Sequence, residues 1–429
     1  MADLRCDIAG VKSPNPFWLA SAPPTDKEYN VVRAFKAGWG GVVWKTLGED
    51  PPIVNVSSRY GAMSYNGTRM AGFNNIELIT DRPLDVNLRE IKQVKRDWPD
   101  RAMVVSLMVP CEEENWRAIL ALVEDTGADG VELNFGCPHG MSERGMGSAV
   151  GQVPEYIEMV TRWCKAHTRM PVFVKLTPNV TNVLGPARAA KAGGADAVSL
   201  INTINSIASV DLDVMAPTPT VDGKGTHGGY CGPAVKPIAM HMVAEIARDA
   251  ETAGLPISGI GGISNWRDAA EFMTLGAGSV QVCTAAMHHG FKIVEDMIDG
   301  LGYWMDEKGY KTLDDFRGAA VPNVTDWQYL NINYEIVAKI DQDLCIKCGL
   351  CHIACEDTSH QAIAAQKDTS KPGGLRRYEV IDQECVGCNL CMHVCPVEGC
   401  ISMVEMDNGK GYLNWKEDPR NPMNQKAAE

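Results

Sequence analysis

The residues with the most recognisable chemistry are cysteines near the C-terminus. Nine of the 15 cysteines lie in the last 85 residues, and eight of these form two Cys-x2-Cys-x2-Cys-x3-Cys runs, the second followed by proline. In such tandem runs three closely spaced thiolates hold one four-iron cluster, and the fourth cysteine ligates the other cluster. The spacing therefore predicts two [4Fe-4S] clusters. The first would be held by Cys345, Cys348, Cys351 and Cys395, and the second by Cys385, Cys388, Cys391 and Cys355.

Zinc ions and disulfide bonds fit the spacing of these cysteines less well. Cys-x2-Cys pairs could hold two tetrahedral zinc ions, but zinc does not require a third cysteine at the same short spacing, twice, or a closing Cys-Pro. A disulfide scaffold is excluded because the cysteines are odd in number and gathered in one part of a long chain. The ninth cysteine, Cys400, is interpreted as a packed thiol, since eight ligands are already accounted for.

A second group of candidate functional residues lies in the first 300 residues. Cys137 follows a strand-like run and opens a loop punctuated by glycines. A cysteine at such a place is usually part of a core. However, Lys45, Lys175 and the pair Asn202-Thr203 each end another strand-like run, so these polar groups are expected to converge on one rim. The pattern favours an active site that contains Cys137.

The elements that must position these residues alternate between strand and helix. Eight apolar runs read as buried parallel strands, and amphipathic segments of helical length separate most of them. The strand candidates are 17–22, 41–47, 103–109, 130–135, 172–177, 197–203, 257–263 and 279–285. Eight such units predict an α/β fold with a closed (β/α)8 barrel, whose active site lies at the carboxyl ends of the strands. An open doubly wound sheet is the alternative, but no early dinucleotide-binding fingerprint supports it.

Length and composition complete the domain organisation. We expect the barrel over residues 1–318, a linker over 319–335, and a small ferredoxin-like domain with both clusters over 336–429. The net charge of −14 argues against a nucleic-acid partner. The longest apolar stretch, 102–110, is too short to span a membrane, and no signal-peptide run follows the N-terminus. A cytoplasmic protein is therefore expected.

With these motifs in place, the sequence resembles the dihydropyrimidine dehydrogenases, and specifically their pyrimidine-reducing half, which in bacteria is a separate subunit. The resemblance covers nearly the whole chain. It rests on the loop Cys137–Gly147, the strand end Val174–Val180, the triplet Ile201–Thr203 and the tandem cysteine runs. It implies an FMN-binding barrel in which Ser21, Lys45, Thr46 and Lys175 touch the flavin ring, and Gly232, Gly261, Gly262, Cys283 and Thr284 surround the ribityl chain and phosphate. The glycines after the seventh and eighth strands agree with the usual phosphate site of such barrels.

The same resemblance implies a substrate and a reaction. Uracil or thymine would be held by Asn75, Asn134, Asn202 and Thr203, and an Asn amide suits a ring edge that alternates donors and acceptors. Reduction of the C5–C6 double bond would take hydride from FMN to C6, while Cys137 protonates C5. One departure from the family is Gly136, where serine is common, and it leaves the effect on the loop and on substrate preference open.

The resemblance also implies partners. Because the chain has no dinucleotide fingerprint of its own, electrons from NAD(H) would arrive through a partner subunit that binds FAD and NAD, and then through the clusters. A homodimer of this chain within a hetero-oligomer is expected. Two alternatives stay open: an FMN/iron–sulfur reductase of another cyclic amide or enone, such as a dihydroorotate-type substrate, and a non-catalytic electron-transfer module.

Overall fold

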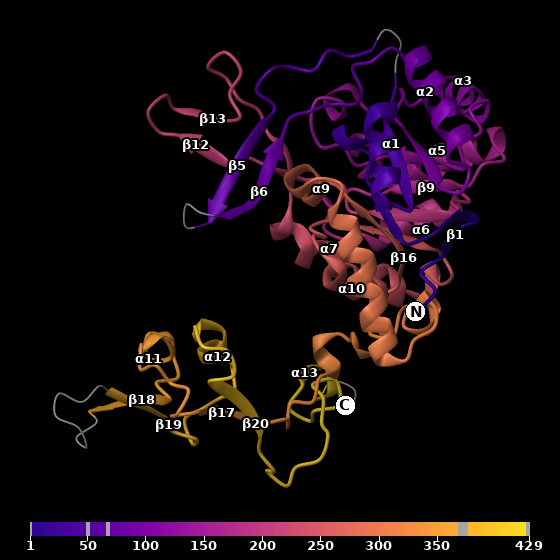
Figure 1. Cartoon of the computed structure of the whole chain (residues 1–429). Helices are drawn as coiled ribbons and strands as arrows, with labels where there is room; N and C mark the ends of the chain where they lie inside the picture. The colour runs from indigo at the N-terminus through magenta and orange to yellow at the C-terminus, as the bar shows by residue number, and fades with distance from the viewer. Residues whose placement is uncertain (1, 49–51, 66–68, 368–375, 426–429) are drawn as a thin grey trace. The chain divides into compact units, whose positions relative to one another are not determined.

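The first part of the chain is a closed barrel of eight parallel strands (Figure 1). The computed structural model describes residues 2–48, 52–65, 69–367 and 376–425. Around the barrel the strands follow in chain order, and the last pairs with the first. They are β3 (Phe17–Leu19), β4 (Gly41–Leu47), β7 (Ala102–Leu107), β8 (Gly130–Asn134), β9 (Val172–Lys175), β10 (Ala197–Leu200), β15 (Ile257–Ile260) and β16 (Ala277–Val282). The predicted (β/α)8 barrel is confirmed.

These strands form because their residues are apolar on both faces. Every residue of the eight strands is buried, as expected for a parallel sheet whose outer face is covered by helices and whose inner face fills the barrel. Helices lie between successive strands and bury one apolar side each. They are α1 (Glu28–Ala37), α2 (Leu84–Asp97), α3 (Glu113–Glu124), α4 (Ser148–Gly151), α5 (Pro154–His167), α6 (Leu184–Ala192), α7 (Lys236–Arg248), α8 (Trp266–Thr274), α9 (Thr284–His289) and α10 (Ile293–Lys308).

The amino ends of the barrel strands are closed by an N-terminal hairpin. Strands β1 (Cys6–Ile8) and β2 (Val11–Ser13) pair antiparallel. The Cys6 thiol donates to the carbonyl of Gly278, 3.3 Å away, near the start of β16. Because this end is covered, a functional cavity is left to the carboxyl end of the barrel.

Short antiparallel strands stand over the carboxyl end, and the sequence did not predict them. Four of them form one sheet in the order β11, β14, β6, β5, and two more form a separate hairpin; both structures extend away from the barrel in Figure 1. They are β5 (Tyr60–Tyr65), β6 (Arg69–Asn75), β11 (Ile204–Ser206) and β14 (Gly228–Cys231), and the pair β12 (Ser209–Asp211) and β13 (Ala216–Thr218). Glycine obscured the strand pattern here. A Cβ on Gly229 would lie 2.0 Å from the Thr203 hydroxyl, so the glycine is needed for the close approach.

The second compact unit runs from Thr325, so the predicted linker 319–335 is divided between the two units. It contains two antiparallel strand pairs, two short helices that overlap the cysteine runs, and a further short helix beyond them. Its elements are β17 (Ile336–Ile340), α11 (Leu350–Glu356), β18 (Ile363–Lys367), β19 (Arg376–Val380), α12 (Leu390–Val394), β20 (Ile401–Glu405) and α13 (Pro422–Gln425). Met1 and residues 426–429, which the predicted domains include, lie outside the described residues.

Within the described ranges, no helix combines the length and the apolar character that crossing a bilayer requires.

Candidate functional site

A cavity lies at the carboxyl end of the barrel, between the strand ends and the antiparallel sheet above them. It encloses about 1150 Å³, including space open to solvent. All fourteen flavin- or substrate-site residues that the sequence indicated line it: Ser21, Lys45, Thr46, Asn75, Asn134, Cys137, Lys175, Asn202, Thr203, Gly232, Gly261, Gly262, Cys283 and Thr284. The structure therefore brings together residues that are spread over more than half of the chain.

Two of the three asparagine amides that line the cavity, those of Asn134 and Asn202, are joined in one hydrogen-bonded network, and Asn75 is held separately. Asn202 donates through Nδ2 to Oδ1 of Asn134 at 2.9 Å, and Asn134 donates through Nδ2 to the Thr46 hydroxyl at 3.0 Å. The Thr46 hydroxyl also lies 3.1 Å from that of Ser21. Asn75, on β6, donates to the carbonyl of Gly229 at 3.0 Å. Each amide is thus oriented by a neighbour, which prepares it to present a defined donor and acceptor to a ligand.

Cys137 lies in this cavity on a loop that packs down over it. The thiol is 8% exposed and donates to the carbonyl of His139 at 3.4 Å. It belongs to a small apolar cluster with Met141 and Met146 of the same loop and with Ile79 and Met108 from below. Burial raises the pKa of the Cys137 thiol to about 11. The thiol is therefore fully protonated near neutral pH, as a proton donor must be.

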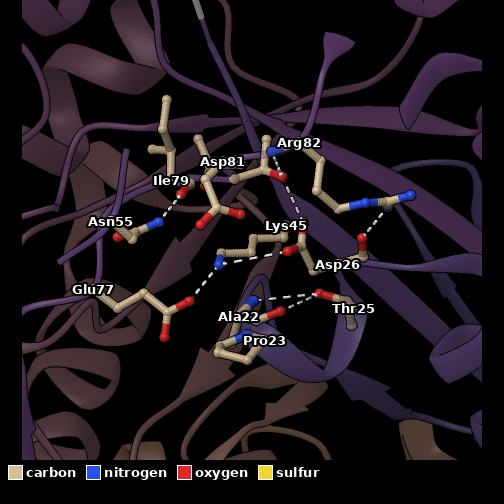
Figure 2. Close-up of polar contacts among 12 residues, drawn as sticks. Ala22, Pro23, Thr25, Asp26, Lys45, Asn55, Glu77, Ile79, Asp81 and Arg82 are labelled. Atoms are coloured by element: carbon tan, nitrogen blue, oxygen red, sulfur yellow. Dashed lines mark hydrogen bonds and ion pairs between the residues drawn. The ribbon is translucent and has the colours of Figure 1, made fainter. Parts of the chain in front are cut away.

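A buried ion-pair network surrounds Lys45, and Figure 2 shows it reaching between two carboxylates. The Lys45 ammonium lies 2.5 Å from Oε1 of Glu77 and 3.7 Å from Oδ2 of Asp26. Glu77 also accepts from the Tyr60 hydroxyl and lies 3.4 Å from Nη1 of Arg59. Burial raises the pKa of Asp26, although Lys45 and a hydrogen bond from a threonine oppose this. The Glu77 carboxylate is thus held inside the cavity by cationic and hydroxyl partners.

Glu77 and Tyr60 both line the cavity but were not found from the sequence. Tyr60 lies on β5, one of the unpredicted strands. The signal for Glu77 was weak: a single acidic residue two positions after Asn75 and flanked by Ile76 and Leu78. His139 lies in the loop that carries Cys137, and its sequence position did not indicate a role. It is buried, with Nε2 3.0 Å from the Glu77 carbonyl, and burial lowers the pKa of its imidazole.

The far side of the cavity has the features that FMN would need. Gly232, Gly261 and Gly262 have φ values of 103°, 127° and 73°, which favour glycine. These turns bring backbone close to the cavity, next to the start of α9, where Thr284 lies. The side-chain amide oxygen of Gln281, Oε1, is buried and has no hydrogen-bond partner among the described residues. A ligand with hydroxyl groups and a phosphate would satisfy both features, so the residues present fit FMN.

Gly136, the position that departs from the resemblance, lies directly against a proposed substrate residue. A Cβ at Gly136 would lie 2.4 Å from Cβ of Asn202 and 2.5 Å from its Nδ2. Any larger residue would therefore displace the Asn202 side chain from this position. The hydrogen bond between Asn202 and Asn134 is therefore possible in this arrangement because residue 136 is glycine.

In the second unit, the eight cysteines of the tandem runs line two separate cavities. One is lined by Cys345, Cys348, Cys351 and Cys395, and the other by Cys355, Cys385, Cys388 and Cys391. Each set takes its fourth member from the opposite run. Backbone N–H groups point at two of the sulfurs, from Ala362 to Cys355 at 3.2 Å and from Ala338 to Cys385 at 3.5 Å.

Apolar side chains complete both cavities, and the buried Cys400 also lines the first. Four thiolates around an apolar hollow, with N–H donors to sulfur, fit a cubane cluster in each cavity. In the described part of the chain, no three His, Cys, Asp or Glu side chains converge closely enough to hold a single metal ion.

Comparisons with known proteins identify both parts of the chain. A dihydroorotate dehydrogenase family model matches residues 3–305, and a 4Fe-4S dicluster domain model matches residues 338–403. The chain is 41% identical to the NAD-dependent dihydropyrimidine dehydrogenase subunit PreA of Escherichia coli K12 over 95% of this chain and 97% of that protein. It is 39% identical to the chloroplastic dihydropyrimidine dehydrogenase (NADP(+)) of Arabidopsis thaliana over 79% and 80% of the two chains.

A solved structure supports the fold. The ligand-free DHODH of Eimeria tenella superposes with a TM-score of 0.61 at 21% identity, over 74% of this chain and 92% of that one. The chain therefore belongs to the dihydropyrimidine dehydrogenase family of oxidoreductases, as a barrel of the dihydroorotate dehydrogenase type joined to a 4Fe-4S dicluster domain.

Proposed function

We propose that the protein reduces the C5–C6 double bond of uracil or thymine to the 5,6-dihydropyrimidine. One observation carries the proposal: three asparagine amides, Asn75, Asn134 and Asn202, line the same cavity as a buried, protonated thiol. The names of the relatives from Escherichia coli and Arabidopsis point to the same substrate class.

The polar groups of the cavity suit a pyrimidine ring. Uracil and thymine carry carbonyl acceptors and N–H donors in alternation, and a primary amide can pair with both kinds of group in one plane. Asn202 and Asn134 would each offer such an amide, and the Thr203 hydroxyl beside them adds a group that can donate or accept. The Glu77 carboxylate accepts only, so it would favour a ring N–H at its position. A ring without these groups would leave buried polar atoms unpaired, which gives selectivity.

The protein's own residues supply the proton and the charges around the reaction. Bound FMN, held by Ser21, Lys45, Thr46, Lys175 and the glycine turns with Cys283 and Thr284, would supply the hydride for C6. Cys137 would deliver its proton to C5. The loop that carries Cys137 excludes water with Met141 and Met146, both of which are buried. The two lysines, each paired with a carboxylate, place charged N–H donors in the cavity, where negative charge accumulates when a flavin is reduced.

Electrons would reach the cavity through the two clusters from a partner subunit that binds FAD and NAD(H). The word "subunit" in the name of the Escherichia coli relative supports a divided enzyme. We place this enzyme in the cytoplasm, as a homodimer of the chain within the hetero-oligomer. The proposal includes one FMN and two [4Fe-4S] clusters per chain, which the three cavities and the dicluster family model support.

A substrate panel tests the proposal. The purified holoprotein is reduced chemically, and reoxidation of its flavin is followed after uracil, thymine, orotate or a simple enone is added without air. Fast reoxidation by uracil or thymine, with the dihydropyrimidine as product, supports the proposal. Preference for orotate would instead support a dihydroorotate-type reductase. No reoxidation by any member would leave electron transfer as the barrel's role.

A further inference from the structure

Glu132 is a fully buried carboxylate to which the proposed reaction gives no part. It lies on β8, two residues before Asn134, and its side chain has no exposed surface. Because side chains alternate along a strand, Glu132 and Asn134 point to the same, inner side of the barrel. Asn134 lines the cavity, and Glu132 is one layer below it. A charge at such a depth is costly unless it is paired.

The partner of Glu132 is one of the two cavity lysines. Oε1 of Glu132 lies 3.4 Å from Nζ of Lys175, whose side chain is 6% exposed. Oε1 has no hydrogen-bond partner in the described part of the chain, so the ion pair is its one polar contact there. Lys175 stands on β9 directly opposite Asn134 in the strand register, and it reaches both the cavity above and the carboxylate below.

The other carboxylate oxygen is anchored by side chains of two further barrel strands, β10 and, on the opposite side of the barrel, β16. Oε2 accepts from the Ser199 hydroxyl at 2.7 Å and from Nε2 of Gln281 at 3.2 Å. Gln281 donates in turn to the Ser258 hydroxyl at 3.1 Å. These contacts come from three different strands, and they fix the carboxylate on the barrel axis beneath the cavity. Its charge is therefore held in place whether or not a ligand is bound above.

The two lysines of the cavity are neutralised in different ways. Lys45 meets Glu77 within the cavity, where Glu77 is also exposed to a ligand, and it meets Asp26 outside the residues that line the cavity. Lys175 meets Glu132 from below, and Glu132 itself does not line the cavity. Hence Glu132 does not line the cavity, and its two contacts that do are Lys175, through the ion pair, and Gln281, through the hydrogen bond to Oε2.

We propose that Glu132 is a positioning residue for bound FMN: it holds Lys175 under the flavin and offsets part of the lysine's charge. A lone buried cation would favour the reduced, anionic flavin strongly and would make it a poorer hydride donor. The ion pair keeps a directed N–H donor but weakens this preference. The inference rests on the proposed FMN site but not on the identity of the substrate.

The test is the reduction potential of the flavin in a Glu132→Gln variant. Glutamine has nearly the same shape and can still accept from Ser199 and Gln281, and a buried amide is less costly than a buried carboxylate. A redox titration of the holoprotein against a reference dye gives the flavin potential, with the cluster signals separated by electron paramagnetic resonance. We expect reduced FMN to become at least tenfold more favoured over oxidised FMN. For a two-electron couple, that is a rise of about 30 mV.

A matched control removes the same charge outside the cavity. Asp196 lies just before β10, pairs with Lys165 at 2.6 Å, and does not line the cavity. Asp196→Asn should leave the flavin potential unchanged. Lys175→Gln should lower it, because a cation is lost from the flavin. The effect of Glu132→Gln should also be smaller in a protein that already carries Lys175→Gln than in the wild type. In that protein the lysine charge that Glu132 offsets is absent.

These results separate the inference from a structural role and from the proposed function. An unchanged or lowered potential in Glu132→Gln, with FMN retained, would overturn the inference. If the variant is isolated without FMN, its affinities for added oxidised FMN and for added reduced FMN are measured separately. The ratio of these two affinities reports the same preference for reduced FMN as the potential does. A ratio equal to that of the wild type would also overturn the inference. Failure of the wild type to reduce pyrimidines would refute the proposed function instead, and the potential could still be measured.

Discussion

The proposed role of Cys137 as proton donor can be tested by removing its thiol, so that only the methyl side chain of alanine remains. In Cys137→Ala the cavity keeps its lysines, amides and glycine turns, because Cys137 neither ligates a cluster nor hydrogen-bonds to any of these groups. FMN content, both clusters and electron uptake should therefore be retained. Only the step that protonates C5 should fail.

The size of the expected loss distinguishes a chemical role from a packing role. Removal of a positioned general acid costs typically 10²–10⁴-fold in rate, which is about 2.7–5.5 kcal/mol. Truncating one buried side chain of this size to alanine lowers the free energy of unfolding by about 1 kcal/mol. The packing loss would fall on the apolar cluster with Met141 and Met146 and would appear as a small shift in melting temperature. A rate loss of 100-fold or more cannot come from the loss of packing.

The pH dependence gives a second, independent check. Burial raises the pKa of the Cys137 thiol to about 11. The protonated thiol is the donor, so pyrimidine reduction should be flat between pH 7 and 10 and fall only as pH approaches 11. Oxidation of the dihydropyrimidine needs the thiolate, so its rate should rise about tenfold per pH unit over the same range. An ordinary thiol would lose its proton near pH 8.5.

The assay is single-turnover flavin reoxidation by uracil, measured for the wild type, Cys137→Ala and Cys137→Ser. The serine variant should fall between the other two, since a hydroxyl has a proton but a far higher pKa. Wild-type rates in Cys137→Ala would refute the assignment of the acid, and a reduction rate that halves near pH 8.5 would refute the raised pKa of its thiol.

Three further predictions concern the rest of the molecule. Asn202→Ala should weaken uracil binding by about 1–3 kcal/mol because a ring donor or acceptor is left unpaired; binding titrations with FMN absorbance as the control would contradict this if the affinity were unchanged. Metal analysis should find about eight irons per chain, and Cys388→Ser should reduce the signal of one cluster only; zinc in place of iron would refute the cluster assignment. The chain alone should not oxidise NADH at a useful rate and should do so once an FAD- and NAD-binding partner is added, so rapid NADH-dependent uracil reduction by the isolated chain would contradict the proposed electron route.

Much of the candidate site could be predicted because its signals are local. A parallel barrel requires continuous apolar strands, and Gly41–Leu47 or Ala102–Leu107 display that requirement directly. A lysine or asparagine at the end of such a strand must lie on the catalytic rim, wherever the strand stands in the ring. The cysteine spacing is equally local, since three ligands of each cluster lie within seven residues.

The contacts between side chains could not be predicted in the same way. Among the rim strands, β11 has only three residues, β14 has two glycines among four, and β5 and β6 each contain a glycine, so neither periodicity nor propensity marks them. Glu77 was missed for a related reason, because its importance comes from meeting Lys45 across the cavity, 32 positions away in the chain.

By itself, the sequence determined the barrel, the two cysteine sets and which strand ends carry polar residues, because strand period and motif spacing are properties of neighbouring residues. Only the tertiary structure decided how these groups are charged and paired. The pKa of Cys137 depends on the loop that buries it. Glu132 meets Lys175 from the neighbouring strand β9 and Ser199 from the next strand, β10, and its contact with Gln281 depends on closure of the barrel, which brings β16 opposite β8. The strength of an electrostatic interaction depends on the distance between the charged groups, and folding sets that distance.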